Sequence, residues 1–131
     1  MGDRYGESCF GFEDLEVYRE AQVFQRGMYK VAKGLPPEER YALGQQIRRA
    51  AISVTNNIAE GYGRFSWQDM THFCRQARGS LLELVDDINI CAAENYAAPA
   101  TLGELKEKAR NVHRLLNGYL RYLQNNKSQG Q

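Results

Sequence analysis

The sequence has few of the residues that mark several common classes of protein. It contains only three prolines and three cysteines in 131 residues. Cys9, Cys74 and Cys91 are odd in number and lack Cys-x-x-Cys spacing, which argues against a disulfide framework and a zinc site. No apolar run approaches the roughly 18 residues that span a bilayer, and the first residues lack an apolar signal segment. We therefore expect a cytoplasmic protein without a membrane partner.

The motifs of familiar enzyme classes are also missing. The chain has no Gly-x-Ser-x-Gly, no His-Glu-x-x-His and no Walker-type loop, and His72 and His113 are isolated. A nucleophile with a base and an orienting group cannot be assembled around Asn57 and Glu60. The sequence therefore predicts a protein that is not an enzyme, with no catalytic residue, metal ligand, cofactor or small-molecule substrate.

Apolar residues recur with helical spacing along the chain, and no stretch alternates with period two for long enough to form a strand. The apolar stripes predict helices near residues 14–33, 38–61, 67–95 and 102–126 within a single domain covering residues 1–131, with frayed termini. Because the connections are short, we predict an all-α fold, an antiparallel up-down-up-down four-helix bundle.

Local signals mark the predicted helix ends. Gly34, followed by Leu35 and two prolines, has the pattern of a C′ glycine and a stop. Residues 66–69 and 101–104 have capping-box spacing ahead of the third and fourth helices, and Phe65 and Met70 are placed as a hydrophobic staple.

Each predicted helix also has an interior glycine, which costs roughly 1 kcal/mol relative to alanine. The glycines lie at similar heights along the bundle in two pairs, Gly27 with Gly44 and Gly79 with Gly118. We predict that neighbouring helices approach each other closely at these two levels.

The charge is balanced overall and alternates along the chain. The net charge is +1, and successive segments 1–39, 40–65, 66–96 and 97–131 carry −3, +3, −3 and +4. In the predicted topology each helix faces neighbours of opposite sign. We interpret this alternation as surface complementarity within the bundle, in preference to a nucleic-acid-binding stripe on the fourth helix.

Residues 48–64, RRAAISVTNNIAEGYGR, combine a core face with an unusual outer face. On a helical wheel, Arg49, Ser53, Asn56 and Glu60 form a polar stripe almost opposite the apolar face. Ile52 and Ala59 lie on one flank, where a plain solvated face needs no apolar residue. The pattern fits either a solvated face or an assembly surface.

Three segments, FEDLEVYREA, YALGQQIRRAAISVTNNIAEGYGR and FCRQARGSLLELVDDI, resemble the small four-helix-bundle proteins encoded in intervening sequences of large-subunit ribosomal RNA genes. These proteins look like relatives of the accessory variability proteins of diversity-generating retroelements. The resemblance implies a ring-like homo-oligomer, typically a pentamer. It also implies nucleic acid and reverse transcriptase as partners of the strongly basic retroelement type. This chain departs from that type in its pI near 7.7, and Thr55 stands where the family commonly has proline.

From these observations the sequence predicts a homo-oligomeric scaffold or adaptor. The residues expected at the oligomer interface or in its motif are Arg49, Ile52, Asn56, Asn57, Ala59, Glu60 and Gly61, with Arg49 and Glu60 as partners within or between subunits. The alternative is an accessory protein that binds RNA or DNA weakly through basic patches. Its candidate residues are Arg48, Arg49, Arg64, Arg110, Arg114 and Arg121, with Arg48, Arg49 and Arg64 forming a collar at one end.

Overall fold

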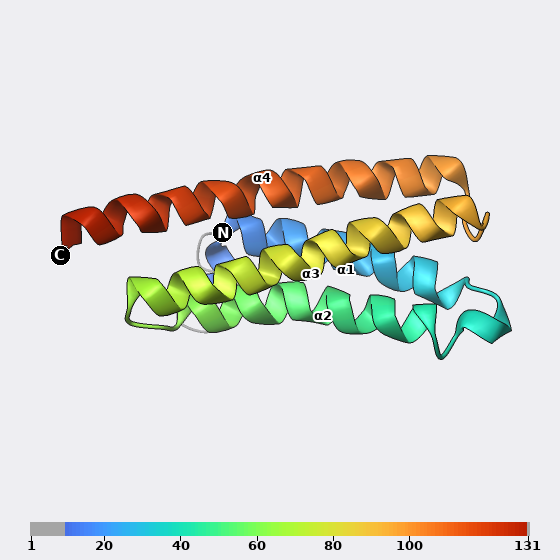
Figure 1. Cartoon of the computed structure of the whole chain (residues 1–131), viewed down its shortest axis with the longest axis horizontal. Coiled ribbons are helices and arrows are strands. Elements are labelled where there is room, and N and C mark those ends of the chain that lie inside the picture. The colour runs from blue at the N-terminus through green and yellow to red at the C-terminus, as the bar shows by residue number, and fades with distance from the viewer. Residues whose placement is uncertain (1–9, 131) are drawn as a thin grey trace.

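The computed structural model of the chain describes residues 10–130, and the side chains as far as Lys127. It contains the helices α1 (Glu16–Lys33), α2 (Leu43–Tyr62), α3 (Trp67–Ala93) and α4 (Pro99–Gly130). Two short 3-10 turns, η2 (Gly11–Asp14) and η3 (Pro37–Glu39), precede α1 and α2, and no strand occurs within residues 10–130. The predicted all-α four-helix bundle is confirmed (Figure 1).

The helices run antiparallel, and α3 lies between α2 and α4 in Figure 1, with α1 behind them. Contacts join each helix to its neighbour in sequence and join α1 to α4, so α1 and α3 are diagonal, as are α2 and α4. The largest side chains of the core are at most 1% exposed and come from all four helices, among them Phe24, Met28, Ile47, Leu81, Leu84 and Leu116. Removal of this apolar surface from water is the main force that holds the bundle together.

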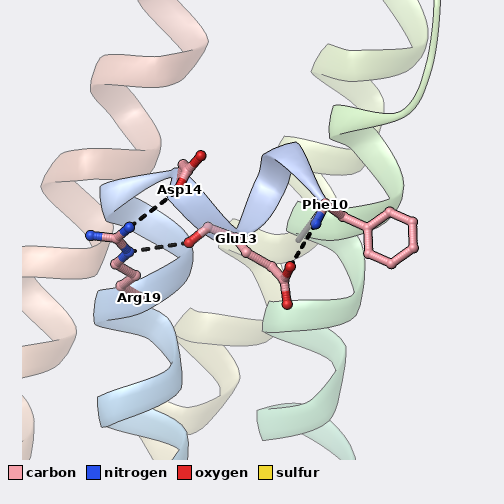
Figure 2. A network of polar contacts seen from close by, with 4 residues as sticks. All are labelled: Phe10, Glu13, Asp14 and Arg19. Atoms are coloured by element: carbon pink, nitrogen blue, oxygen red, sulfur yellow. Dashed lines mark hydrogen bonds and ion pairs between the residues drawn. The ribbon is translucent and has the colours of Figure 1, made fainter. Parts of the chain in front are cut away.

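A polar network fixes the entry into α1 (Figure 2). The Glu13 carboxylate accepts a hydrogen bond of 2.7 Å from the Phe10 backbone N–H. Arg19, one turn into α1, donates to the Glu13 carbonyl at 3.1 Å and to the Asp14 carboxylate at 3.2 Å. The network ties η2 to α1 and leaves the Phe10 ring 72% exposed.

The first and third helices end differently from the prediction. Gly34 has φ −90°, so it is not the left-handed C′ glycine that its position before two prolines suggested. The left-handed residue is Asn95, with φ 59°, just after α3. There the Tyr96 N–H donates to the Cys91 carbonyl at 2.9 Å and the Asn95 N–H to the Ala92 carbonyl at 3.3 Å. This pair of bonds is a Schellman motif, in which asparagine replaces the usual glycine.

Two helices begin at other residues than predicted. α2 begins at Leu43 rather than near residue 38, because the chain after the two prolines first forms η3. α4 begins at Pro99, a residue type favoured at the first helical position, so the predicted capping box at residues 101–104 lies inside the helix. α4 also continues to Gly130, beyond the predicted end at residue 126.

The start of α3 agrees with the prediction in part. The Ser66 hydroxyl accepts a hydrogen bond of 3.0 Å from the Asp69 N–H, as a capping residue should. The predicted staple between Phe65 and Met70 is wrong, because Phe65 is 100% exposed and packs on nothing.

The predicted glycine pairs are also wrong. A Cβ added at Gly27 would lie 2.4 Å from the Leu105 side chain of α4, whereas one at Gly44 would meet the Glu39 carbonyl at 3.3 Å. Gly79 has open space around it, and Gly118 meets only a distant arginine tip. Equal height along the bundle did not bring these glycines together, because height does not fix which way a residue points around its helix axis.

Charge complementarity between helices is not realised as ion pairs. Within residues 10–127, the ion pairs join Arg19 to Asp14, Arg64 to Glu60 and Arg110 to Glu107, each inside one helix or at its end. None of them crosses from one of the four helices to another. Charged groups that contact another helix instead bond to neutral partners, as Arg78 does to Asn117 and Glu20 to Asn111.

Candidate functional site on the outer faces of α2 and α3

A row of polar side chains lies between α2 and α3, and we call it the polar seam: Gln46, Ser53, Asn57, Ser80 and Asp87. The Gln46 amide donates to Asp87 Oδ1 at 3.0 Å, and the hydroxyls of Ser53 and Ser80 lie 2.7 Å apart. Asn57 donates to the Ser53 hydroxyl at 3.0 Å and to the Ser53 carbonyl at 2.8 Å. The seam fixes the register of α2 on α3 through directional bonds rather than apolar contact alone.

The seam has the spacing of a heptad on both helices. Gln46 and Ser53 are seven residues apart on α2, and Ser80 and Asp87 are seven apart on α3. Residues seven apart lie on nearly the same side of a helix, so two antiparallel helices bring Gln46 to Asp87 and Ser53 to Ser80 at successive levels. One level further on, Gly61 lets α2 approach α3, since a Cβ added there would lie 2.9 Å from Phe73 Cβ.

Asp87 is the most unusual residue of the seam because it is a carboxylate with no exposed surface. Its second oxygen, Oδ2, has no hydrogen-bond partner among the described residues. The pKa of Asp87 is raised from 3.8 to about 6, chiefly by desolvation and also by the nearby carboxylates of Glu83 and Asp86, while the Gln46 bond acts in the opposite direction. The group therefore ionises near neutral pH instead of in the acid range.

The outer face of α2 carries most of the residues predicted for an interface. Arg49, Ile52, Asn56 and Glu60 are exposed and Ala59 is half-buried; we call these five residues the α2 outer stripe. Ile52 is 41% exposed, which is a large fraction for an isoleucine near the middle of a bundle helix. Asn57 and Gly61, which the sequence assigned to the same motif, instead lie toward α3, where both line a small cavity with Met70 and Cys74.

Arg64 completes the end of α2. It pairs with Glu60 at 2.5 Å and places its guanidinium 4.8 Å from the centre of the Phe73 ring. Within one copy, Glu60 therefore pairs with Arg64 rather than with Arg49. Arg49 has no ion-pair partner among the described residues.

The outer face of α3 is hollowed beside the seam. A shallow depression of about 360 Å³, the α3 hollow, is lined by His72, Arg75, Gln76, Gly79, Ser80 and Glu83. Gly79 has no side chain to fill it, and no other described residue comes within 4 Å of a Cβ placed there. Sequence reasoning missed the hollow because it treated Gly79 as an internal packing position.

The arginines predicted to bind nucleic acid are spread over the molecule. Arg110, Arg114 and Arg121 are on α4, which is diagonal to α2. Arg48 and the end of α2 at Tyr62 are separated by roughly 20 Å of helix at 1.5 Å per residue. Arg64 lies beyond that end, so one copy does not form the predicted collar of Arg48, Arg49 and Arg64.

The side chains of the site suit binding better than catalysis. The Ser53 and Ser80 hydroxyls bond to each other, and the Ser53 hydroxyl also accepts from the Asn57 amide, with no base in the network. Burial raises the pKa of the Cys74 thiol to about 11 and also raises the pKa of Cys91, which keeps both thiols protonated and unreactive. Among residues 10–130, no group of three or more His, Cys, Asp or Glu residues is placed to hold a metal ion.

Each helix within residues 10–130 is too short or too polar to cross a bilayer.

Comparison with known proteins finds one family. A family model described as 23S rRNA-intervening sequence protein matches residues 13–118, which include α1, α2, α3 and most of α4. No curated protein shows significant similarity to the chain.

Proposed function

Since the chain belongs to the 23S rRNA-intervening sequence protein family, we propose that it is a non-enzymatic scaffold or adaptor that assembles with copies of itself into a ring. The α2 outer stripe of one copy packs on the α3 hollow of the next. A pentamer is the ring size that the sequence resemblance favours. The assembled ring presents the remaining surfaces in several identical copies.

The observation that carries the proposal is the pair of unlike surfaces on α2 and α3. The segment with α2 has net charge +3 and the segment with α3 has −3, yet no ion pair joins the two helices within the described residues. Arg49 on the stripe and Glu83 on the hollow are both exposed. Opposite charges that are not neutralised within one copy favour contact between copies.

The shapes of the two surfaces support the same arrangement. On the stripe the apolar side chain of Ile52 is exposed. In the hollow Gly79 has no side chain, and the space beside it is open. A contact between two different surfaces is heterologous, and it closes into a ring when the rotation between copies divides a full turn.

A charge exchange tests this contact. Arg49→Glu and Glu83→Arg should each weaken self-association by about tenfold, because each places like charges across the interface. The double variant restores opposite charges and should recover most of the loss. Sedimentation velocity over a range of concentrations gives the three dissociation constants. Additive losses in the double variant would contradict the contact.

Nucleic-acid binding is the second candidate function, and the net charge of +4 on the segment with α4 supports it. A ring would repeat these cations and make several weak sites act together. We expect weak binding that does not depend on sequence and that falls steeply with salt, since phosphate contacts release counterions.

Anisotropy titrations of single- and double-stranded DNA and RNA at several salt concentrations measure this binding. Arg110→Gln with Arg114→Gln should reduce it, whereas Arg26→Gln on α1 is the matched control. Tight binding that survives high salt would overturn the scaffold proposal. Absence of binding at low salt would remove the nucleic-acid candidate.

A further inference from the structure

The surface between α3 and α4 contains a groove that is separate from the α2 outer stripe and the α3 hollow. It has a volume of about 190 Å³, and its apolar floor and basic rim are formed by Leu82, Val85, Ala109, Lys106, Arg110 and His113. The floor comes from both helices, while the three basic residues all come from α4. α3 and α4 are in contact and lie side by side in Figure 1.

The floor of the groove exposes apolar surface. Leu82 is 51% exposed, although it neighbours the core residue Leu81, which is fully buried. Apolar surface that is rimmed by polar residues is typical of a binding groove for another protein.

The rim carries positive charge that the chain does not neutralise across the groove. Lys106 donates to the neutral amide oxygen of Asn89 on α3 at 2.6 Å. Arg110 pairs with Glu107 on its own helix, and Arg114 donates to Asn111, also on α4, at 2.7 Å. Within the described residues no carboxylate of α3 forms an ion pair with these cations; Glu107 balances Arg110, whereas Lys106 has only the neutral Asn89 amide as a partner.

We propose that this groove binds an acidic amphipathic helix of a partner protein. Apolar residues of that helix, spaced three and four apart, would cover Leu82 and Val85, and carboxylates along one flank would meet Lys106 and Arg110. A nucleic acid fits less well, because its phosphates would meet the cations but would leave the leucine and valine uncovered. The groove gives the scaffold a partner-binding surface on the side of α3 that faces α4.

The proposal does not depend on self-association, because the α3 hollow and the groove lie on different sides of α3. Variants of the groove should therefore leave the oligomeric state unchanged, and variants of the α2 outer stripe should leave a groove on each separate copy. Failure of one proposal can be told from failure of the other by measuring mass and peptide binding on the same samples.

Synthetic helical peptides provide the probe. The first has about five turns, roughly 18 residues, with leucines at helical spacing and glutamates along one flank. The second has lysine in place of each glutamate, and the third has the composition of the first without its period. Fluorescence anisotropy with the full-length protein measures the three affinities, and a single-stranded RNA oligonucleotide serves as competitor.

The acidic amphipathic peptide should bind most tightly, and its affinity should fall with salt. Leu82→Asp and Arg110→Glu should each weaken its binding by at least about tenfold, because they remove the apolar floor and reverse the rim charge. Val23→Asp, which changes a similarly exposed residue on α1, should have no effect.

Equal binding of the acidic and lysine peptides, or no binding of either, would overturn the proposal. Displacement of the acidic peptide by the RNA at equal concentration would assign the groove to nucleic acid instead. Circular dichroism of each variant checks that the helices are intact, and Arg110→Glu, at an exposed position, tests the groove even if Leu82→Asp loses stability.

Discussion

Asp87→Asn should make the protein progressively more stable than the wild type as the pH rises from about 4 to about 7. In the folded protein the Asp87 carboxylate has no exposed surface, and its pKa is raised from 3.8 to about 6. The unfolded chain ionises this group near pH 4, whereas the folded chain resists ionisation until higher pH. The free energy of unfolding of the wild type therefore loses a contribution of roughly 2–3 kcal/mol through this window.

The sign follows from which state binds the proton. At a pH below the pKa that Asp87 has in the unfolded chain, the group is protonated in both states and has little effect on the free energy of unfolding. Above the folded pKa both states are ionised, and the folded state holds a buried charge whose Oδ2 has no partner. An amide at position 87 keeps the shape of the side chain and an oxygen that can accept the Gln46 bond, but it never ionises.

Urea unfolding at a series of pH values tests this prediction. The readout is the change with pH of the difference between variant and wild type, so a constant offset from the new amide cancels. Asp86→Asn removes an exposed carboxylate next to Asp87 and is the matched control, which should change the curve much less. If the free energies of unfolding of Asp87→Asn and the wild type change in parallel with pH, ionisation of Asp87 does not destabilise the folded protein and the prediction is wrong.

Ile52→Glu should dissociate the proposed ring. The substitution places a charge where the α2 outer stripe packs on the next copy, and the core of an interface is depleted of charged residues. A loss of at least ~2 kcal/mol in the free energy of association per contact, about 30-fold in the dissociation constant, is typical of a substitution at such a central position. Val23→Glu on α1 is the control, because Val23 is 47% exposed and lies outside the stripe and hollow.

Gly79→Leu tests the opposite side of the same contact. In a single copy no described residue lies within 4 Å of the added Cβ, and leucine favours a helix over glycine by up to about 1 kcal/mol. Each copy should therefore be at least as stable as the wild type, while the filled hollow no longer admits Ile52. Size-exclusion chromatography with thermal unfolding measures both properties. A variant that is stable and still assembled would exclude the α3 hollow from the interface.

The fold was predictable because the apolar stripes of all four helices are long and regular. Phe24, Ile47, Leu84 and Leu116 each lie on a predicted apolar face, and each is buried. The helix ends were less predictable because they depend on single backbone angles. Asn95 adopts a left-handed conformation that its sequence context did not single out, whereas Gly34 does not.

The site was predictable only in part. The wheel placed Arg49 and Asn56 on a polar stripe and Ile52 on its flank, and all three are exposed in the structure. It also placed Ser53 on that stripe, which was wrong, because Ser53 is half-buried and its hydroxyl lies 2.7 Å from that of Ser80 on α3. The signal for the polar seam was present in the seven-residue spacing of Gln46 with Ser53 and of Ser80 with Asp87. It became visible only when the partner helix and its register were known.

The mass of the protein in solution tests the central claim of self-association most directly. Multi-angle light scattering at micromolar concentration should give a multiple of the 15.0 kDa chain mass, and Ile52→Glu under the same conditions should give 15.0 kDa. A mass of 15.0 kDa for the wild type at every concentration tested would contradict the account.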